Sequence, residues 1–485
     1  MTNIPSGRPQ QEPFPVSGPV DVLAFIPHSL GFSPQESLVL MTMDSSRLGA
    51  TLRLDLPSAA LDYSEFAARV TELLRSDTAA NGVLMAMYTN LAWKRPEAPP
   101  YRRLVGQLGR HLAEAGLPIL DGWLVSSHAW REYFCTDSSC CPWPGHSLGQ
   151  IADSTLSAEM VYRGSSYAGS LGEAVDLDLP PAWENGGDAA RHRDVYVRQL
   201  KDRWCRRLQF AGTLAVWEVF FTGAGVPDPA GPPGRRELAE PRRGSPQLRD
   251  NPEAAGFLLA SLRARPVRDS LLVMAALGAK RALAGADACN LLSADERPPL
   301  LPTESGGPPQ GWHAQAPETE TETETEMDRR TRAGAAPAAG SGQKGSSRQR
   351  AASNPGGDFN AGGDFRDVLI GQYSGVPDWH GMDAAFAVFA ELLAAADAAD
   401  NAAGERGDGE AAAALLSLLA WIEWARGRGS RAQVYLTRCL ESFPGYRLAE
   451  LLEDLLATGM FPLWARNSGS AWRAASERYP GTARA

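Results

Sequence analysis

The pattern of apolar and polar residues predicts strands in the first part of the chain and helices alone further on. Two short apolar runs, at 37–43 and 49–56, are joined by the polar sequence DSSR, which is typical of a β-hairpin. The run GVLMAMYT at 82–89 has no polar alternation, as in a strand that a sheet buries on both faces. Two further strands are predicted at 118–126 and 129–135, on either side of a short turn.

Amphipathic helices alternate with these strands. The segment 64–75 carries apolar residues along one side, and Ser64 stands where an N-cap is expected. A second helix is predicted at 101–116, where Gly116 ends it. Because strands and helices alternate, we expect an α/β domain with a mixed sheet and flanking helices.

Beyond Cys141 the strand signals fade and the apolar spacing becomes helical. Helices are predicted at 154–164, 194–221, about 252–264 and about 267–284. The segment 296–365 is then rich in proline and glycine and contains the run ETETETETE. Such a composition buries too little apolar surface to offset the entropy of ordering, so we expect a disordered linker there. The polar, proline-rich residues 1–19 lead to the same expectation.

The last part of the chain is helical again, with three helices predicted within 415–459. Gly427, Ala432, Cys439 and Pro444 have the spacing of the small and proline positions of a tetratricopeptide unit. We therefore predict an all-α C-terminal region with a tetratricopeptide-like helical hairpin. The expected organisation is a disordered N-terminus at 1–19, an α/β domain at 20–150, a helical region at 151–295, a linker at 296–365, a helical repeat-like subdomain at 366–470 and a tail at 471–485.

Composition and charge narrow the class of protein. The formal net charge of −10 argues against a dedicated nucleic-acid binder, whose surface is usually basic. The apolar run around 411–425 is interrupted by Glu423 and is too short to span a bilayer, so no membrane association is expected. The N-terminus shows no signal-peptide pattern, and six cysteines in 485 residues do not form a disulfide scaffold. We expect a cytoplasmic protein.

The stretch CTDSSCCPWPGH contains the strongest candidate for chemistry, formed by Cys135, Cys140, Cys141 and His146. A four-residue turn separates Cys135 from Cys140, which would place these two thiols within disulfide range. The proline after Cys141 favours an extended backbone there, so Cys140 and Cys141 are expected to point in different directions. Buried structural thiols are the favoured interpretation. A redox or disulfide pair and a zinc site are the alternatives, and no cofactor is assigned.

A second group consists of His28, Ser37, Arg53 and Asp55, which could line a ligand pocket. Ser37 lies at a strand entry and not on the strand-to-helix elbow of a nucleophilic serine. We therefore expect Ser37 to bond backbone groups, and Arg53 to pair with Asp55 at a surface or interface. No residue is assigned a catalytic role.

Three stretches carry a family resemblance: DVLAFIPHSLGFSPQESLVLMTM, REYFCTDSSCCPWPG and LLAWIEWARGRGSRAQVYLTRCLESFPGYRLAELL. With them the chain resembles an actinobacterial family, domain-of-unknown-function family 4192, from Asp21 to about Trp464. The resemblance implies a bacterial cytoplasmic protein and supplies no activity, substrate or catalytic residue. The segment 296–365 interrupts the resemblance, departs from the compact family pattern and is expected to carry no shared function.

These observations favour an interaction or regulatory protein, with another protein as the expected partner of the C-terminal helices. The alternative is an enzyme or small-ligand-binding protein. Its site would lie near His28, Ser37 and Asp55 or at the cysteine cluster. The sequence names neither the partner nor a substrate, and it does not give the oligomeric state.

Overall fold

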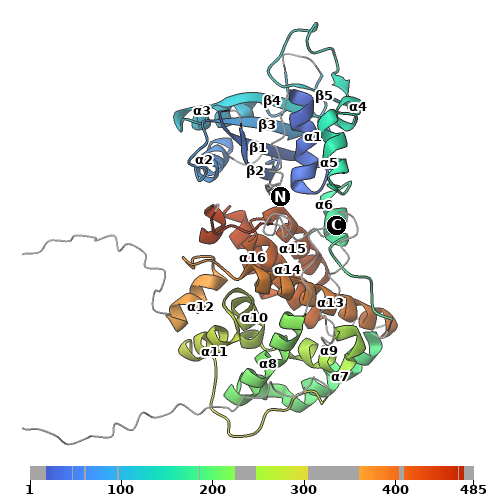
Figure 1. Ribbon diagram of the computed structural model, residues 1–485, viewed down its shortest axis with the longest axis vertical. Coiled ribbons are helices and arrows are strands. Elements are labelled where there is room, and N and C mark those ends of the chain that lie inside the picture. Colours follow the sequence, from blue (N-terminus) through green and yellow to red (C-terminus); the bar gives the residue numbers. More distant parts are fainter. Residues whose placement is uncertain are drawn as a thin grey trace, which may run out of the picture.

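The computed structural model describes residues 18–45, 47–58, 62–94, 98–184, 186–223, 247–303, 360–403, 409–467 and 469–473. A sheet with its helices forms one part of the molecule, and the helices from α6 onward form the other (Figure 1). The predicted division into an α/β part and an all-α part is confirmed.

The sheet has six strands in the order β2-β1-β3-β4-β5-β6. Its parallel pair is β3 with β4, and the other neighbouring pairs are antiparallel, so the sheet is mixed as predicted. The strands are β1 (Ser37–Asp44), β2 (Arg47–Asp55), β3 (Gly82–Tyr88), β4 (Ile119–Val125), β5 (Ala129–Glu132) and β6 (His146–Ser147).

The two central strands β1 and β3 are covered on both faces. Helices α2 (Tyr63–Leu74) and α3 (Arg102–Glu114) pack against one face, where Leu40 and Met85 are fully buried. Helix α1 (Pro19–Leu30) packs against the other face, on Met41 and Ala86. The continuous apolar runs of these strands follow from this double burial. Helices α4 (Gly149–Ala152) and α5 (Thr155–Tyr162) contact α1.

The helical part is built around one apolar core that extends from Val175 to Trp464. The two helical stretches on either side of the low-complexity segment therefore share a core. Its helices are α6 (Leu171–Asp176), α7 (Gly186–Leu200), η1 (Lys201–Cys205), α8 (Arg207–Gly223), η2 (Leu248–Asp250), α9 (Pro252–Ser261), α10 (Arg265–Leu277), α11 (Ala279–Ala288), α12 (Ala361–Leu369), α13 (Trp379–Ala403), α14 (Glu410–Ala425), α15 (Gly429–Ser442), α16 (Arg447–Ala457) and η3 (Leu463–Arg466).

The C-terminal hairpin consists of α14 and α15, and α16 packs against both. Gly427 has a φ of +78° and ends α14, as expected of a glycine after a helix. Ala432 and Cys439 are fully buried, and the Cys439 Sγ lies 3.5 Å from the Ala413 carbonyl. The small side chains therefore lie where the two helices meet, as the spacing predicts.

Some predicted boundaries were wrong. The helix predicted at 194–221 is interrupted, because Lys201 has a φ of +34° and Arg206 is extended and bridges to Ser293. Gly278, with a φ of +89°, divides the helix predicted at 267–284. The first turn of α2 is capped by the Asp62 carboxylate, which accepts from the Ser64 amide, so Ser64 is not the N-cap.

Most of the predicted linker, 304–359, lies outside the described residues, as do residues 1–17. Its ends differ from the prediction. Helix α12 begins at Ala361, and the Leu300 amide donates to Gln209 at 2.8 Å. The Thr303 hydroxyl donates to Glu253 at 2.7 Å, so residues near 300 are held against the helical part.

Helix α15 packs against α6 within the helical part, and its start contacts the end of β2 in the sheet part (Figure 1). Arg431 of α15 forms an ion pair with Asp178, and both side chains are about 90% buried. Arg438 pairs with Asp176 at 2.7 Å. From the sheet, Arg53 Nη1 donates to the Ser430 hydroxyl at 2.9 Å. Arginine side chains therefore hold α15 both to the α6 segment and to the sheet part.

Candidate functional site

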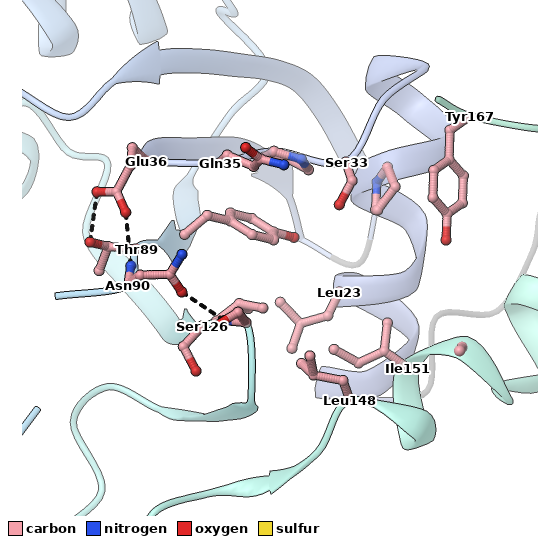
Figure 2. A pocket seen from close by; sticks show the side chains of 16 residues that line it. Leu23, Ser33, Gln35, Glu36, Thr89, Asn90, Ser126, Leu148, Ile151 and Tyr167 are labelled. Atoms are coloured by element: carbon pink, nitrogen blue, oxygen red, sulfur yellow. Dashed lines mark hydrogen bonds between the residues drawn. The ribbon is translucent and has the colours of Figure 1, made fainter. Parts of the chain in front are cut away.

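A pocket of about 390 Å³ opens at the carboxyl ends of the parallel strands β3 and β4 (Figure 2). Residues that follow these strands line it, together with the segment that leads into β1. In sheets with parallel strands, ligands bind in the crevice outside the carboxyl ends of the strands. The polar wall is formed by Ser33, Gln35, Glu36, Thr89, Asn90 and Ser126. Leu23 of α1 and Leu148 and Ile151 near α4 form the apolar wall.

Glu36 joins the loops around the pocket. Its carboxylate accepts from the Thr89 hydroxyl and from the Asn90 amide, both at 2.8 Å. The Asn90 side-chain oxygen in turn accepts from the Ser127 amide at 2.9 Å (Figure 2). Glu36 itself has a φ of +41°, an uncommon backbone conformation for a residue with a side chain. Three separate loops are thus held together by side-chain hydrogen bonds before any ligand binds.

The charge of the lining limits what can bind. The lining residues include the Glu36 carboxylate and no lysine or arginine. Burial and the neighbouring Tyr167 raise the pKa of Tyr88 well above its usual range, so its hydroxyl stays protonated. That hydroxyl makes no hydrogen bond to any described residue and is available as a donor. The lining therefore suits a neutral or cationic molecule better than an anionic one.

Ser37, Arg53 and Asp55, three of the predicted pocket residues, lie together beside the pocket loops. The Ser37 hydroxyl donates to the Gln35 carbonyl at 2.5 Å and accepts from Arg53 Nε at 2.9 Å. Arg53 Nη2 pairs with Asp55 at 2.7 Å. Ser37 thus bonds backbone at the strand start and Arg53 pairs with Asp55 near α15, as predicted. None of the three is among the residues that line the pocket.

His28 is placed elsewhere, at the end of α1. Its Nδ1 lies 2.9 Å from the Ser165 hydroxyl, and its ring packs edge-on against Tyr167 at 4.8 Å. Its Nε2 is buried without a hydrogen-bond partner in the described part of the chain. Burial lowers the pKa of His28 below 6.5, which favours the neutral ring. His28 therefore supports the pocket residue Tyr167 and has no hydrogen bond to Ser37, Arg53 or Asp55.

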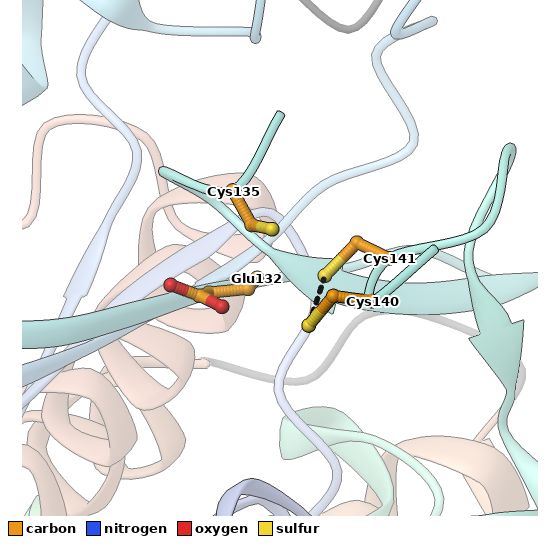
Figure 3. A group of neighbouring side chains, drawn as sticks. All are labelled: Glu132, Cys135, Cys140 and Cys141. Atoms are coloured by element: carbon orange, nitrogen blue, oxygen red, sulfur yellow. Dashed lines mark hydrogen bonds between the residues drawn. The ribbon is translucent and has the colours of Figure 1, made fainter. Parts of the chain in front are cut away.

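The cysteine cluster forms a second candidate site (Figure 3). The Sγ atoms of Cys135, Cys140 and Cys141 and one Glu132 carboxylate oxygen all lie within 4.8 Å of one another. Cys140 and Cys141 approach to 4.0 Å between sulfur atoms, and the three cysteines are free thiols. Burial and the Cys135 thiol raise the pKa of Cys141 to about 12, so without a metal this thiol is unreactive.

Two expectations about this stretch were wrong. Cys140 and Cys141 do not point apart, because their sulfur atoms lie 4.0 Å from each other and both lie within 4.8 Å of the Cys135 sulfur. His146 does not belong to the group, because it is in β6 and its ring lies against Trp130, at 4.6 Å between ring centres. The fourth side chain is that of Glu132, the last residue of β5.

The comparison with protein families supports the earlier resemblance. A family described as a domain of unknown function, DUF4192, matches residues 19–292 and 312–463. The chain belongs to this family. No curated protein and no solved structure matches the chain.

The DUF4192 match includes the pocket and the cysteine cluster, which both lie within 19–292. It also resumes at residue 312, so the match is interrupted over a shorter range than the predicted 296–365. The described residues contain no helix long and apolar enough to cross a bilayer.

Sequence reasoning missed several pocket residues, among them Thr89, Asn90 and Ser126. A signal for them exists, because Thr89 and Ser126 each directly follow an apolar strand and Asn90 comes next. When two such strands pair in parallel, the polar residues behind them meet at the same edge of the sheet. Glu132 was missed because it is a strand residue, and its place beside the cysteines depends on how the chain turns after β5.

Proposed function

We propose that this protein binds a small uncharged or cationic molecule in the pocket at the carboxyl ends of β3 and β4. We further propose that it is a regulatory protein whose helical part responds to that binding. The pocket carries the proposal, because polar loops already joined by Glu36 surround a volume of about 390 Å³. That volume falls within the range of ligand sites in other proteins.

The chemistry of the lining defines the class of ligand. Hydroxyl and amide groups face the apolar side chains of Leu23, Leu148 and Ile151 across the pocket. A ligand with hydroxyl or amino groups on one side and an apolar face on the other matches both walls. Phosphate or carboxylate groups would meet Glu36 without a compensating cation, which is unfavourable in a partly buried site.

One route to the helical part runs through the chain that follows α5. Tyr167 lines the pocket, and the Ala168 amide donates to the Gly31 carbonyl at 3.0 Å. Helix α6 comes next, and just after it Asp178 forms the buried ion pair with Arg431 of α15. A ligand that moves Tyr167 would therefore act on a short segment anchored at both ends.

A second route begins at Glu36. Its neighbour Ser37 accepts a hydrogen bond from Arg53, which also donates to Ser430 at the start of α15. Both routes reach the same helix. This convergence on α15 supports the proposal that a protein partner binds the C-terminal helices in a way that depends on whether the pocket is occupied. The free thiols at the cysteine cluster are consistent with a reducing cytoplasm, which we include in the proposal.

The experiment compares two phenylalanine variants with the wild type in thermal unfolding. Ala152→Phe fills the pocket from an exposed position on α4, whereas Ala158→Phe adds the same side chain at an exposed position on α5, away from the lining. The probes are nucleosides, sugars and aliphatic amines, each paired with its phosphorylated or carboxylated counterpart. Binding at 100 times the Kd would stabilise the folded state by about 2.7 kcal/mol.

We expect neutral or cationic probes to raise the melting temperature of the wild type and of Ala158→Phe, and not of Ala152→Phe. Anionic counterparts should have no effect. If stabilising probes act equally on all three proteins, or if only anionic probes stabilise them, the proposed pocket function is wrong.

A further inference from the structure

We propose that Glu132, Cys135, Cys140 and Cys141 bind one zinc ion that fixes the loop after β5. The proposal is independent of the pocket function. It rests on the geometry of the four side chains and on an unusual arginine beside them.

The four ligand atoms are nearly in position. In a tetrahedral site with Zn–S distances of about 2.3 Å, two sulfur atoms are separated by about 3.8 Å. Cys140 and Cys141 have their sulfur atoms 4.0 Å apart, and no pair in the group exceeds 4.8 Å. The sulfur atoms would have to draw together by about 1 Å at most, and the Glu132 oxygen and a sulfur by about 1.3 Å at most, which side-chain rotation can provide.

The loop that carries the cysteines is held by its own backbone. The Cys141 amide donates to the Asp137 carbonyl at 2.8 Å, and the Asp137 side chain accepts from the Ser139 amide, also at 2.8 Å. This tight turn brings Cys140 and Cys141 back toward Cys135 (Figure 3). The adjacent cysteines can therefore act as ligands together.

Arg131 provides an independent observation. Its side chain is 2% exposed, and its Nη2 donates to the Cys135 carbonyl at 3.2 Å. Its Nε and Nη1 are buried without hydrogen-bond partners among the described residues. The guanidinium packs against the rings of Trp93 and Trp143, at 4.6 and 5.0 Å from their centres.

A buried guanidinium with two unbonded nitrogens is costly unless negative charge lies nearby. Three thiolates and one carboxylate around Zn²⁺ carry a net charge of −2. Such a centre would supply that charge next to Arg131, which already contacts the backbone of one ligand residue. A metal centre thus explains why the Arg131 guanidinium is buried beside the cysteines, whereas neutral thiols do not.

Four protein ligands complete a tetrahedral zinc site and leave no position for water. The expected role is therefore structural: zinc would hold the loop between β5 and β6. Binding requires deprotonated thiols, so each zinc bound releases protons and stabilises the folded loop.

The test uses the full chain, expressed with added zinc and purified without chelators. We expect about one zinc ion per chain by elemental analysis. Cys140 is exposed, so Cys140→Ser should fold while losing roughly tenfold or more in zinc affinity, measured by competition with a chromogenic chelator. Cys205→Ser is the matched control, because Cys205 lies in η1 away from the cluster, and it should bind zinc as the wild type does.

Two further measurements keep the proposal testable if Cys140→Ser misfolds. Glu132→Gln should also weaken zinc binding, and wild-type affinity in this variant would overturn the assignment of Glu132. Titration of the metal-free wild type with Co²⁺ should produce thiolate-to-cobalt charge-transfer absorption. Absence of that absorption, or zinc far below one per chain in the wild type, would overturn the site.

Discussion

Replacing Glu423 with glutamine should strongly destabilise the helical part of the protein. Glu423 lies in α14 and is 0% exposed. One oxygen of its carboxylate accepts from Arg426 and from Arg428, both at 2.6 Å. Arg426 also pairs with Asp383 at 2.7 Å, and its side chain is 6% exposed. Glu423→Gln would remove the negative charge that neutralises two mostly buried guanidinium groups, those of Arg426 and Arg428.

The pKa of Glu423 gives the magnitude. Burial raises this pKa, but Arg428, Arg426 and Arg431 outweigh burial and lower it from 4.5 to about 2. This difference of about 2.5 between the pKa of Glu423 in the unfolded and in the folded chain corresponds to about 3 kcal/mol of stability at neutral pH. Breaking a buried ion pair by removing one partner typically costs about 3–5 kcal/mol, which agrees with that value.

The sign of the pH dependence follows from the lowered pKa. The unfolded chain protonates Glu423 more readily than the folded chain does, so the stability from this carboxylate is present above pH 4.5 and lost as the pH falls toward 2. Between about pH 7 and about pH 3.5 the wild type should lose about 1 kcal/mol of this contribution. Glu423→Gln has no carboxylate to protonate, so the difference in stability between the wild type and this variant should become smaller as the pH falls.

Urea unfolding followed by tryptophan fluorescence at the two pH values measures this difference. Trp421 and Trp424 are buried on the same helix and report on its surroundings. Glu441→Gln, at an exposed position on α15, is the control and should match the wild type. The reasoning would be refuted if Glu423→Gln were as stable as Glu441→Gln, or if the gap to the wild type widened as the pH falls.

Two further predictions concern other parts of the fold. Ala432→Leu should lower the free energy of unfolding in urea by about 1–3 kcal/mol, because Ala432 is fully buried where α15 meets α14. An unchanged unfolding midpoint would mean that the helices do not meet there. Burial lowers the pKa of His28 below 6.5, so the stability of the wild type should fall as the pH drops from about 6.5 toward the folded-state pKa. His28→Gln should remove this dependence of stability on pH. An equal dependence in both proteins would contradict the burial of a neutral ring.

The strands were predictable because buried strands consist largely of apolar residues that are consecutive in the sequence. The runs at 37–43 and 82–89 are mostly apolar without regular alternation, and the corresponding β1 and β3 are covered on both faces. Helix α1 was not predicted, since Pro27 lies within it and helical interiors rarely accept proline. The break at Lys201 was not predictable either. It depends on the contact of Arg206 with Ser293, which lies far along the chain.

The candidate sites were predictable only in part, for a related reason. Three cysteines close in sequence already indicate a cluster, but its fourth member, Glu132, depends on the turn after β5. The pocket depends on three loops that meet only because β3 and β4 pair in parallel beside β1. Single-sequence patterns describe faces of helices and strands. They do not describe which loop ends the sheet brings together.

The contact between the two parts of the molecule has a bearing on regulation. Between the two parts, Arg53 of the sheet donates to Ser430 of α15, and the Arg431–Asp178 and Arg438–Asp176 ion pairs hold the adjoining α6 segment against α15. Most buried residues of the two parts belong to separate apolar clusters, and one small cluster of Phe32, Ala168 and Ala174 joins the parts. Interfaces between domains that are polar in this way commonly permit relative motion. Ion pairs also respond to small displacements, because the attraction between charges depends on distance and on access of water. In the proposed function, a ligand that shifts Tyr167 or Glu36 would therefore act on segments that contact this junction.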